Sequence, residues 1–161
     1  MSQSALIAYD EAKRALDDQA KTLDGLRARA GTLLAVASLV TSFLGGQVLA
    51  KPTIKEALVI RADIGALGWI AIAAFLGVVV ATMAILWPYR DWRFNLSAST
   101  ITQWDVSEAE AKGHLAIFHE ENYDANAPRL QNLFWCFQAG CLLLGIETIA
   151  WILDLAEVNP F

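Results

Sequence analysis

Charged residues are scarce in this chain, and three long stretches have none. Asp, Glu, Lys and Arg make up 18% of its 161 residues, against 56% hydrophobic residues. No charge occurs at residues 30–50, 64–89 or 130–146. Because an α-helix rises about 1.5 Å per residue, about 20 residues cross the roughly 30 Å hydrocarbon core of a bilayer. Three such stretches leave too little polar surface for a soluble bundle, so we predict three membrane-spanning helices.

Cysteine and histidine are also rare, and their positions argue against metal or nucleophile chemistry. Cys136 and Cys141 both fall inside the third apolar stretch, where they fit small packing residues. His114 and His119 are five residues apart, which separates them by about 140° around a helix. No nucleophile motif and no glycine-rich phosphate loop is present. We therefore expect no enzyme, no metal site and no bound cofactor, and the net charge of −5 argues against nucleic-acid binding.

The predicted fold class is an all-α integral membrane protein. A long N-terminal cytoplasmic helix is expected to continue into the first span, and a short cytoplasmic helix is expected between spans two and three. The predicted segments are a cytoplasmic helix at 1–30, a first span at 31–50, an outer loop at 51–64, a second span at 65–87, a cytoplasmic segment at 88–129, a third span at 130–153 and an outer tail at 154–161. In the cytoplasmic segment the helix covers about 106–123, capped by Asp105 or Ser107, and "DANAP" (124–128) is expected to break it.

Basic residues predict the orientation of these spans. Five lie before the first span and four between spans two and three, whereas the 51–64 loop has three. Lys and Arg are enriched in cytoplasmic loops, so the N-terminus is expected inside and the C-terminus outside. Arg27 and Arg29 then fall at the inner headgroup layer, just before the apolar stretch begins near Gly31.

The N-terminal segment has a seven-residue repeat, marked by Asp10, Asp17 and Asp24. Its apolar residues follow a 3–4 spacing that Gln19 interrupts: Tyr9, Ala12, Leu16, Leu23, Leu26 and Ala30. This pattern fits either a short coiled coil between chains or an amphipathic helix that packs on another part of the same chain. The sequence alone leaves both alternatives open.

Small residues form two adjacent rows along the first span. One row is Ala37, Thr41 and Gly45, and the other is Ser38, Ser42 and Gly46. In lipid, small residues allow helices to approach closely, so we expect these rows to pack against other helices, within the chain or in a homo-oligomer.

Glu147 lies inside the third span, and intramembrane carboxylates usually face a bundle interior or a water path. Gln138 lies nine residues earlier, about 180° away around the helix, so the two side chains are not expected to share one face. Glu147 is therefore a candidate for ion or proton transfer, the alternative being a carboxylate that snorkels outward or bonds to a neighbouring helix.

The order of segments resembles a known family of bacterial membrane proteins. The resemblance rests on "RARAGTLL" (27–34), the hairpin with a brief outer loop, the charged inner segment and "NAPRLQNLFWCFQAGCLLLG" (126–145). This layout resembles the transmembrane effectors of Pycsar antiphage systems and, more loosely, SLATT membrane modules. The resemblance implies an oligomeric inner-membrane protein that senses a cyclic nucleotide in the cytoplasm and then disrupts the membrane or forms a pore in it.

A nucleotide phosphate would need cations on the inner side. Away from the N-terminal helix these are Arg90, Arg93, Lys112 and Arg129. "PYRDWRF" (88–94) places Tyr89 and Trp92 as stacking faces beside Arg90 and Arg93, so these four residues are the predicted ligand site. Anchoring at the membrane interface explains the same residues. The alternative function is a constitutive small membrane protein, either an ion or proton pathway or an interaction scaffold.

Overall fold

In this computed structural model, the structure describes residues 3–49, 65–88, 92–94 and 106–158, and every regular element in these ranges is a helix. The elements are helix α1 (Gln3–Val40), the π-helical turn η1 (Thr41–Gly45), helix α2 (Gly46–Leu49), helix α3 (Ala66–Leu86) and helix α5 (Glu108–Val158). Three helices are long and apolar enough to cross a membrane, in agreement with the three predicted spans.

The chain forms two units, to which α1 and α5 both contribute. The two-helix unit comprises Met1–Arg27 and Pro88–Phe134, and the three-helix unit comprises Ala28–Trp87 and Trp135–Phe161. The division falls close to the point in each long helix where the charged sequence ends and the apolar stretch begins.

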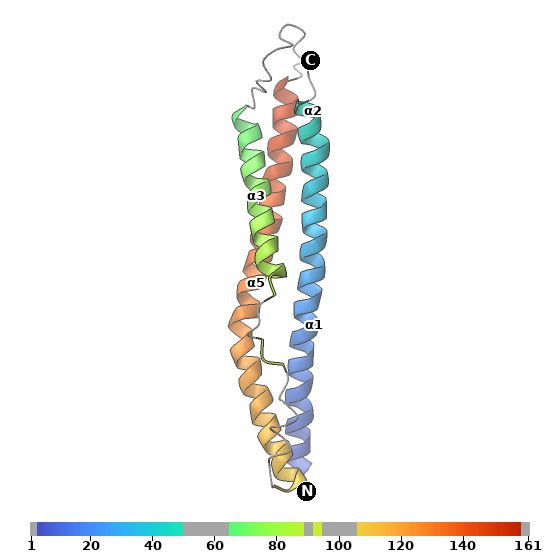
Figure 1. The fold of residues 1–161 in the computed structure, drawn as a ribbon, viewed down its shortest axis with the longest axis vertical. Helices are drawn as coiled ribbons and strands as arrows, with labels where there is room; N and C mark the ends of the chain where they lie inside the picture. Colours follow the sequence, from blue (N-terminus) through green and yellow to red (C-terminus); the bar gives the residue numbers. More distant parts are fainter. Residues whose placement is uncertain (1–2, 50–64, 89–91, 95–105, 159–161) are drawn as a thin grey trace. The chain divides into compact units, whose positions relative to one another are not determined.

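The helices of the three-helix unit lie side by side (Figure 1). Several of the contacts between them are made at glycines. A Cβ atom at Gly45 would lie 3.1 Å from Trp151, and one at Gly140 would lie 2.9 Å from Leu33, so α1 and α5 run parallel. A Cβ atom at Gly77 would lie 2.7 Å from Leu143. Further contacts join Gly65 to Asp154 and Ala81 to Gly140, so α3 runs antiparallel to α5. Such close approaches are typical of helices that associate in lipid.

The interior of the three-helix unit contains many small residues beside a few large ones such as Ile85 and Trp151, and its exterior carries many large apolar side chains. Ala37, Ala71 and Gly68 are buried, whereas Leu39 is 70% exposed and Phe43 is 68% exposed. A water-soluble bundle has the opposite distribution, because large apolar side chains gain most from leaving water. Both the size and the placement of the outer residues therefore fit a unit surrounded by lipid.

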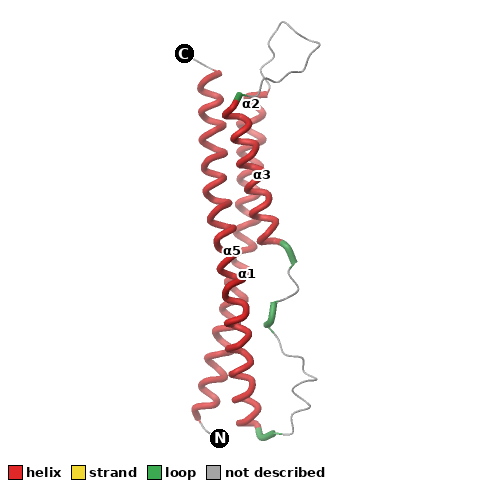
Figure 2. Tube along the Cα trace, turned by 90° about the vertical axis from the view of Figure 1, so that its left-hand side faces the viewer, coloured by secondary structure: helices red, strands yellow, loops and turns green. Residues whose placement is uncertain are grey.

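The helices of the two-helix unit run side by side (Figure 2), and buried leucines form a seam between them. Leu16, Leu23 and Leu26 are buried, and the Gln19 side chain donates a hydrogen bond from Nε2 to the Tyr123 carbonyl of α5 at 3.1 Å. Of the two alternatives for the N-terminal helix, the structure therefore shows packing on another part of the same chain.

Helix α1 continues without interruption into the first apolar stretch, as predicted, but α5 differs from its prediction. The sequence predicted a helix over about 106–123 that breaks at 124–128, whereas α5 runs from Glu108 to Val158 with Pro128 inside it. The proline removes one backbone hydrogen bond, at a cost of about 3 kcal/mol in a helix interior. Among the polar residues expected to form a loop, Asn126 is instead buried in the two-helix unit. Its Oδ1 accepts a hydrogen bond from the Arg93 backbone N–H, and its Nδ2 donates one to the Arg93 C=O.

The start of α5 matches one of the two predicted caps. Ser107 precedes the helix, and its hydroxyl accepts a hydrogen bond from the Glu110 N–H while the Glu110 carboxylate accepts from the Ser107 N–H and hydroxyl. This reciprocal arrangement is a capping box. The hydrogen bonds from Ser107 lower the pKa of Glu110.

Two predicted outer segments have different outcomes. The 51–64 loop lies outside the described residues. The predicted tail at 154–161 is helical through Val158 as part of α5, and Asp154 within it is only 4% exposed. This residue therefore belongs to the interior of the three-helix unit rather than to a solvated tail.

Candidate functional site

Glu147 lies in the interior of the three-helix unit and is 0% exposed. Thr41 of η1 donates a hydrogen bond from its hydroxyl to Glu147 Oε1. The second carboxyl oxygen, Oε2, is buried and has no hydrogen-bond partner among the residues described. Because burying a polar group without a partner is costly, an intramembrane acid in this position is a candidate functional group.

The partner of Glu147 comes from an irregular turn. Thr41 is the first residue of η1, where α1 passes from α-helical to π-helical hydrogen bonding. A π-helical turn inside an α-helix changes the direction of the side chains that follow it, and such turns occur frequently at functional sites. Gly45 ends the turn against the Trp151 ring, and a Cβ atom there would be 3.1 Å from Trp151 Cζ2. The turn therefore joins Thr41 to Glu147 and Gly45 to Trp151.

The predicted separation of Gln138 from Glu147 is confirmed. Gln138 is exposed on the outside of the three-helix unit, and Glu147 is buried inside it. These two polar residues of the third apolar stretch therefore have different surroundings, and only Glu147 belongs to the site.

Sequence reasoning missed two further polar groups on the inner face of α5. Trp151 and Asp154 follow Glu147 by four and seven residues and are 2% and 4% exposed. Trp151 Nε1 and Asp154 Oδ2 are buried without a partner in the described part of the chain. The signal that was available is the spacing, because residues i, i+4 and i+7 lie on one helix face. Assigning Asp154 to an outer tail concealed it.

The two rows of small residues have different surroundings. Ala37 and Gly45 are buried and Thr41 is half-buried, so this row packs inside the three-helix unit. In the other row, Ser38, Ser42 and Gly46 are exposed. The sequence did not distinguish the rows, because both consist of small residues at the same spacing.

The predicted nucleotide residues are only partly described. Tyr89 and Arg90 lie outside the described residues. Trp92 stacks on Phe94, with ring centroids 5.6 Å apart and planes 9° from parallel. Arg93 is exposed, and its backbone N–H and C=O bond to Asn126 at 3.3 and 3.2 Å. Trp92 therefore stacks on a neighbouring ring, while the Arg93 side chain is at the surface.

The other predicted phosphate ligands already have partners. Lys112 forms an ion pair with Glu108 at 2.8 Å, one turn earlier on α5. Its hydrogen bond lowers the pKa of Glu108, and the same bond raises the pKa of Lys112. Arg129 also takes part in an interaction within the chain.

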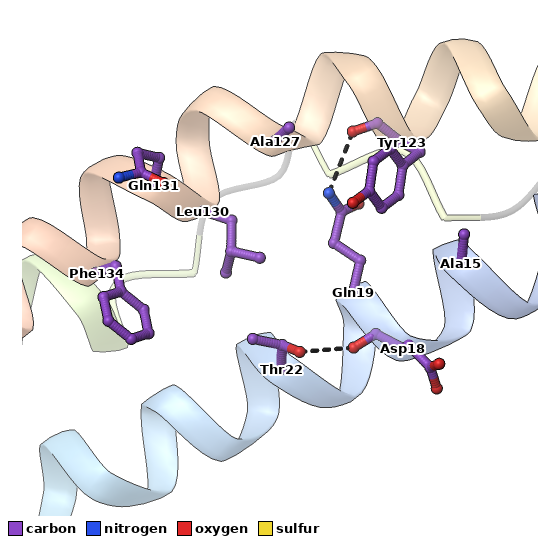
Figure 3. A pocket seen from close by; sticks show the side chains of 9 residues that line it. All are labelled: Ala15, Asp18, Gln19, Thr22, Tyr123, Ala127, Leu130, Gln131 and Phe134. Carbon is purple, nitrogen blue, oxygen red and sulfur yellow. Dashed lines mark hydrogen bonds between the residues drawn. The ribbon is translucent and has the colours of Figure 1, made fainter.

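A groove of about 490 Å³ lies between α1 and α5 of the two-helix unit (Figure 3). Its polar lining comes from Asp18, Gln19 and Thr22 on one helix and Gln131 on the other, with the Tyr123 and Phe134 rings beside them. Among the residues that the structure describes, neither lysine nor arginine lines it. The described lining therefore offers hydrogen-bonding and aromatic groups but no positive charge for a phosphate.

His119 lies at the contact between α1 and α5 in the two-helix unit. Its ring lies 5.8 Å from the Tyr9 ring across the helix pair, and its Nδ1 is buried without a partner in the described ranges. Burial lowers the pKa of His119, and nearby Asp17 partly opposes this effect. Within the same described ranges, no group of three or more His, Cys, Asp or Glu residues has the arrangement of a metal site.

No protein-family model, no curated protein and no solved structure matches this chain.

Proposed function

We propose that this chain is a multi-pass effector of a bacterial inner membrane that changes the permeability of that membrane. The observation that carries the proposal is Glu147, a fully buried carboxyl group held by Thr41 at a π-helical turn. A buried acid among apolar helices is expensive to keep for packing alone, because apolar residues of similar size pack there at lower cost. A role in moving protons or small cations accounts for that cost.

The proposed placement in the membrane rests on two further features. The three-helix unit has its large apolar side chains outside and its small and polar side chains inside, which suits lipid. The distribution of Lys and Arg favours a cytoplasmic N-terminus, which would place the two-helix unit in the cytoplasm.

A cyclic nucleotide is the proposed activating ligand, as the resemblance to Pycsar effectors implies. Tyr89, Arg90, Trp92 and Arg93 remain the residues proposed to bind it, and the exposed side chain of Arg93 agrees with this role. The groove beside Gln19 is unsuited to the phosphate because it is lined by Asp18 and by no cation. The effector is proposed to act in antiphage defence.

We further propose that the effector is a homo-oligomer. The exposed row Ser38, Ser42 and Gly46 supports this, since small residues on the outside of a membrane helix allow a second helix to approach closely.

Purified protein in liposomes tests the proposed function. Vesicles that contain a pH-sensitive dye are challenged with a potassium diffusion potential, with and without cyclic nucleotides, and dye response reports proton flux. We expect flux that rises when a cyclic nucleotide is added. Protein-free vesicles and vesicles given the linear nucleotide are the controls. Flux equal to that of protein-free vesicles under every condition would rule the proposal out.

The second candidate function is a constitutive ion or proton pathway, which the same buried carboxyl group favours. It differs in one outcome of the liposome experiment, because flux through a constitutive pathway does not depend on any nucleotide. An interaction scaffold, by contrast, predicts no flux and gives Glu147 no role beyond packing.

A further inference from the structure

The surroundings of Glu147 differ between its two sides along the helix axis. Toward the C-terminal end of α5, the inner face continues with Trp151 and Asp154. The atoms Glu147 Oε2, Trp151 Nε1 and Asp154 Oδ2 are all buried without a partner among the described residues. We call these three residues the polar file. Seven residues of helix separate its two carboxyl groups by about 10 Å along the axis.

In the other direction, the interior is apolar apart from Thr82, whose buried hydroxyl donates to the Val78 and Val79 carbonyls of its own helix. One turn before Glu147, Leu143 and Leu144 pack with Phe137 against a buried cluster that includes Ala37 and Val78. Gly77 lies against Leu143 so closely that a Cβ atom there would be 2.7 Å from the leucine methyl. We call this cluster the apolar plug. Closely packed apolar side chains leave no polar group through which a proton or a water molecule could pass.

The polar file leads to the end of the three-helix unit. Asp154 lies four residues before the end of α5, and its Oδ1 lies against Gly65, the residue that precedes α3. Since one helix begins and the other is about to end at this level, Asp154 is close to the rim of the unit. Its carboxyl group is therefore the last of the buried polar groups described on the inner face of α5.

We propose that, without an activating ligand, Glu147 exchanges its proton with only one side of the membrane, through the polar file, while the apolar plug closes the other side. The proton leaves a Glu147 carboxyl oxygen, passes through bridging water from that side to the Asp154 carboxylate, and is released from Asp154 to bulk water. Uptake is the reverse. Trp151 donates its indole N–H to the bridging water and keeps its own proton, so no other bond forms or breaks.

Few other ionisable groups face this route. In the described residues of the three-helix unit, α3 has none, and α1 contributes Arg29, twelve residues before Thr41 and so about 18 Å from it along the axis. On α5 itself the other ionisable side chains that the structure describes in this unit are Cys136 and Cys141, of which Cys141 is exposed on the outside of the unit. Proton exchange between Glu147 and bulk water should therefore depend mainly on Asp154.

Labelling with dicyclohexylcarbodiimide tests this inference directly, because the reagent dissolves in lipid and forms a stable adduct only with a protonated carboxyl group. The protein is reconstituted with a C-terminal tag, and protease removal of the tag identifies the vesicles in which the Asp154 end faces out. The pH is changed from about 8 to about 5.5 on one side at a time, and the adduct at Glu147 is measured by mass spectrometry. Glu147→Gln identifies the specific adduct.

We expect labelling of Glu147 to rise severalfold when the pH falls on the Asp154 side and to stay constant when it falls on the opposite side. Asp154→Asn should abolish this response, and Asp154→Glu should retain it. A purely structural contact between Asp154 and Gly65 would leave the sidedness unchanged. Leu143→Ser, which places a hydroxyl in the apolar plug, should make labelling respond to both sides and tests the inference even if Asp154→Asn fails to fold.

Labelling that follows the pH of the opposite side, or of both sides equally in the wild type, would overturn the inference, as would an absence of labelling at every pH. The inference rests on the proposed placement of the three-helix unit in the membrane. The inference and the proposed function can fail separately. Flotation of the vesicles shows whether the protein is inserted, and the dye experiment measures permeability. Labelling of Glu147 requires neither proton flux nor a nucleotide.

Discussion

The two units of this protein bury different kinds of side chain. The two-helix unit buries leucines, including Leu16 and Leu23, and keeps ion pairs such as Lys21 with Asp18 at its surface. The three-helix unit buries alanine, glycine and threonine and exposes Leu39 and Phe43. Water drives the first arrangement through the hydrophobic effect, whereas close contact between small residues stabilises the second in lipid. One chain thus follows two sets of packing rules, and the change occurs within α1 and α5.

Each unit also buries a polar side chain that forms a hydrogen bond between two helix segments. In the two-helix unit this is Gln19, which bonds Tyr123 through Nε2 and leaves Oε1 without a partner in the described residues. In the three-helix unit it is Glu147, which bonds Thr41. The amide is neutral and interrupts a regular heptad seam, a position where polar residues typically fix register. The carboxyl group can gain or lose a proton, so the comparison assigns a structural role to Gln19 and a functional role to Glu147.

The largest effect on stability is expected where α1, α3 and α5 meet at a glycine. A side chain at Gly140 would collide with Leu33 and Ala81, whereas nothing lies within 4 Å of a Cβ atom at Gly145. Overpacking costs about 1–3 kcal/mol, so Gly140→Leu should lower the unfolding midpoint in detergent by roughly 5–10 °C. Gly145→Leu is the matched control and should leave the midpoint unchanged. Equal effects of both substitutions would show that the three-helix unit does not depend on glycine contacts.

The two rows of small residues should respond differently to isoleucine. Gly45→Ile would meet the Trp151 ring inside the unit and should destabilise it, whereas Ser42→Ile lies on the exposed row and should leave unfolding unchanged. Ser42→Ile should instead reduce the mass of the assembly in nanodiscs, as measured by light scattering. An unchanged mass for Ser42→Ile would contradict the proposed contact between copies.

A smaller effect is expected at the buried amide of the two-helix unit. Gln19→Leu removes the unpartnered Oε1 and restores the leucine seam, so it should raise the free energy of unfolding by about 1 kcal/mol. Denaturant unfolding followed by circular dichroism measures the change. Thr22→Leu, one turn away and exposed, is the control and should have almost no effect. A loss of stability in Gln19→Leu would mean that the amide contributes more than its single hydrogen bond suggests.

The smallest effect concerns pH and His119. Burial lowers the pKa of His119, so the folded state favours the neutral ring and the unfolded state binds a proton more readily. The stability that this provides is present above the unfolded pKa of about 6.5 and is lost as the pH falls toward the folded value. Unfolding midpoints measured from about pH 7.5 to about pH 5.5 should fall less steeply in His119→Gln than in the wild type. Identical slopes would contradict the burial of this ring.

The sequence was sufficient for features that depend on composition and local pattern. The three apolar stretches follow from the absence of charge and the continuity of α1 from the absence of a proline, and Ser107 was one of two capping residues, with Asp105, expected before the helix. It also separated Gln138 from Glu147, because helical geometry alone fixes that angle.

Features that depend on tertiary contacts could not be predicted in the same way. Pro128 and its polar neighbours read locally as a loop, but the Asn126 contact with Arg93 and the apolar residues beyond keep α5 helical. The row that contains Thr41 and the row that contains Ser42 have the same composition, so only packing distinguishes them. Likewise, nothing in the local sequence distinguishes Asp154 from the acidic residue of a solvated tail.

The most direct test of the central claim is the proton flux, measured with the cyclic nucleotide present, through vesicles that contain the Glu147→Gln protein, compared with wild type and with Gln138→Ala at the same protein content. Glutamine keeps the size of the side chain and its bond to Thr41 but cannot exchange a proton. We predict that Glu147→Gln reduces the flux to that of protein-free vesicles, while Gln138→Ala, on the exposed face of the same helix, retains the wild-type value. Wild-type flux through Glu147→Gln would contradict the account.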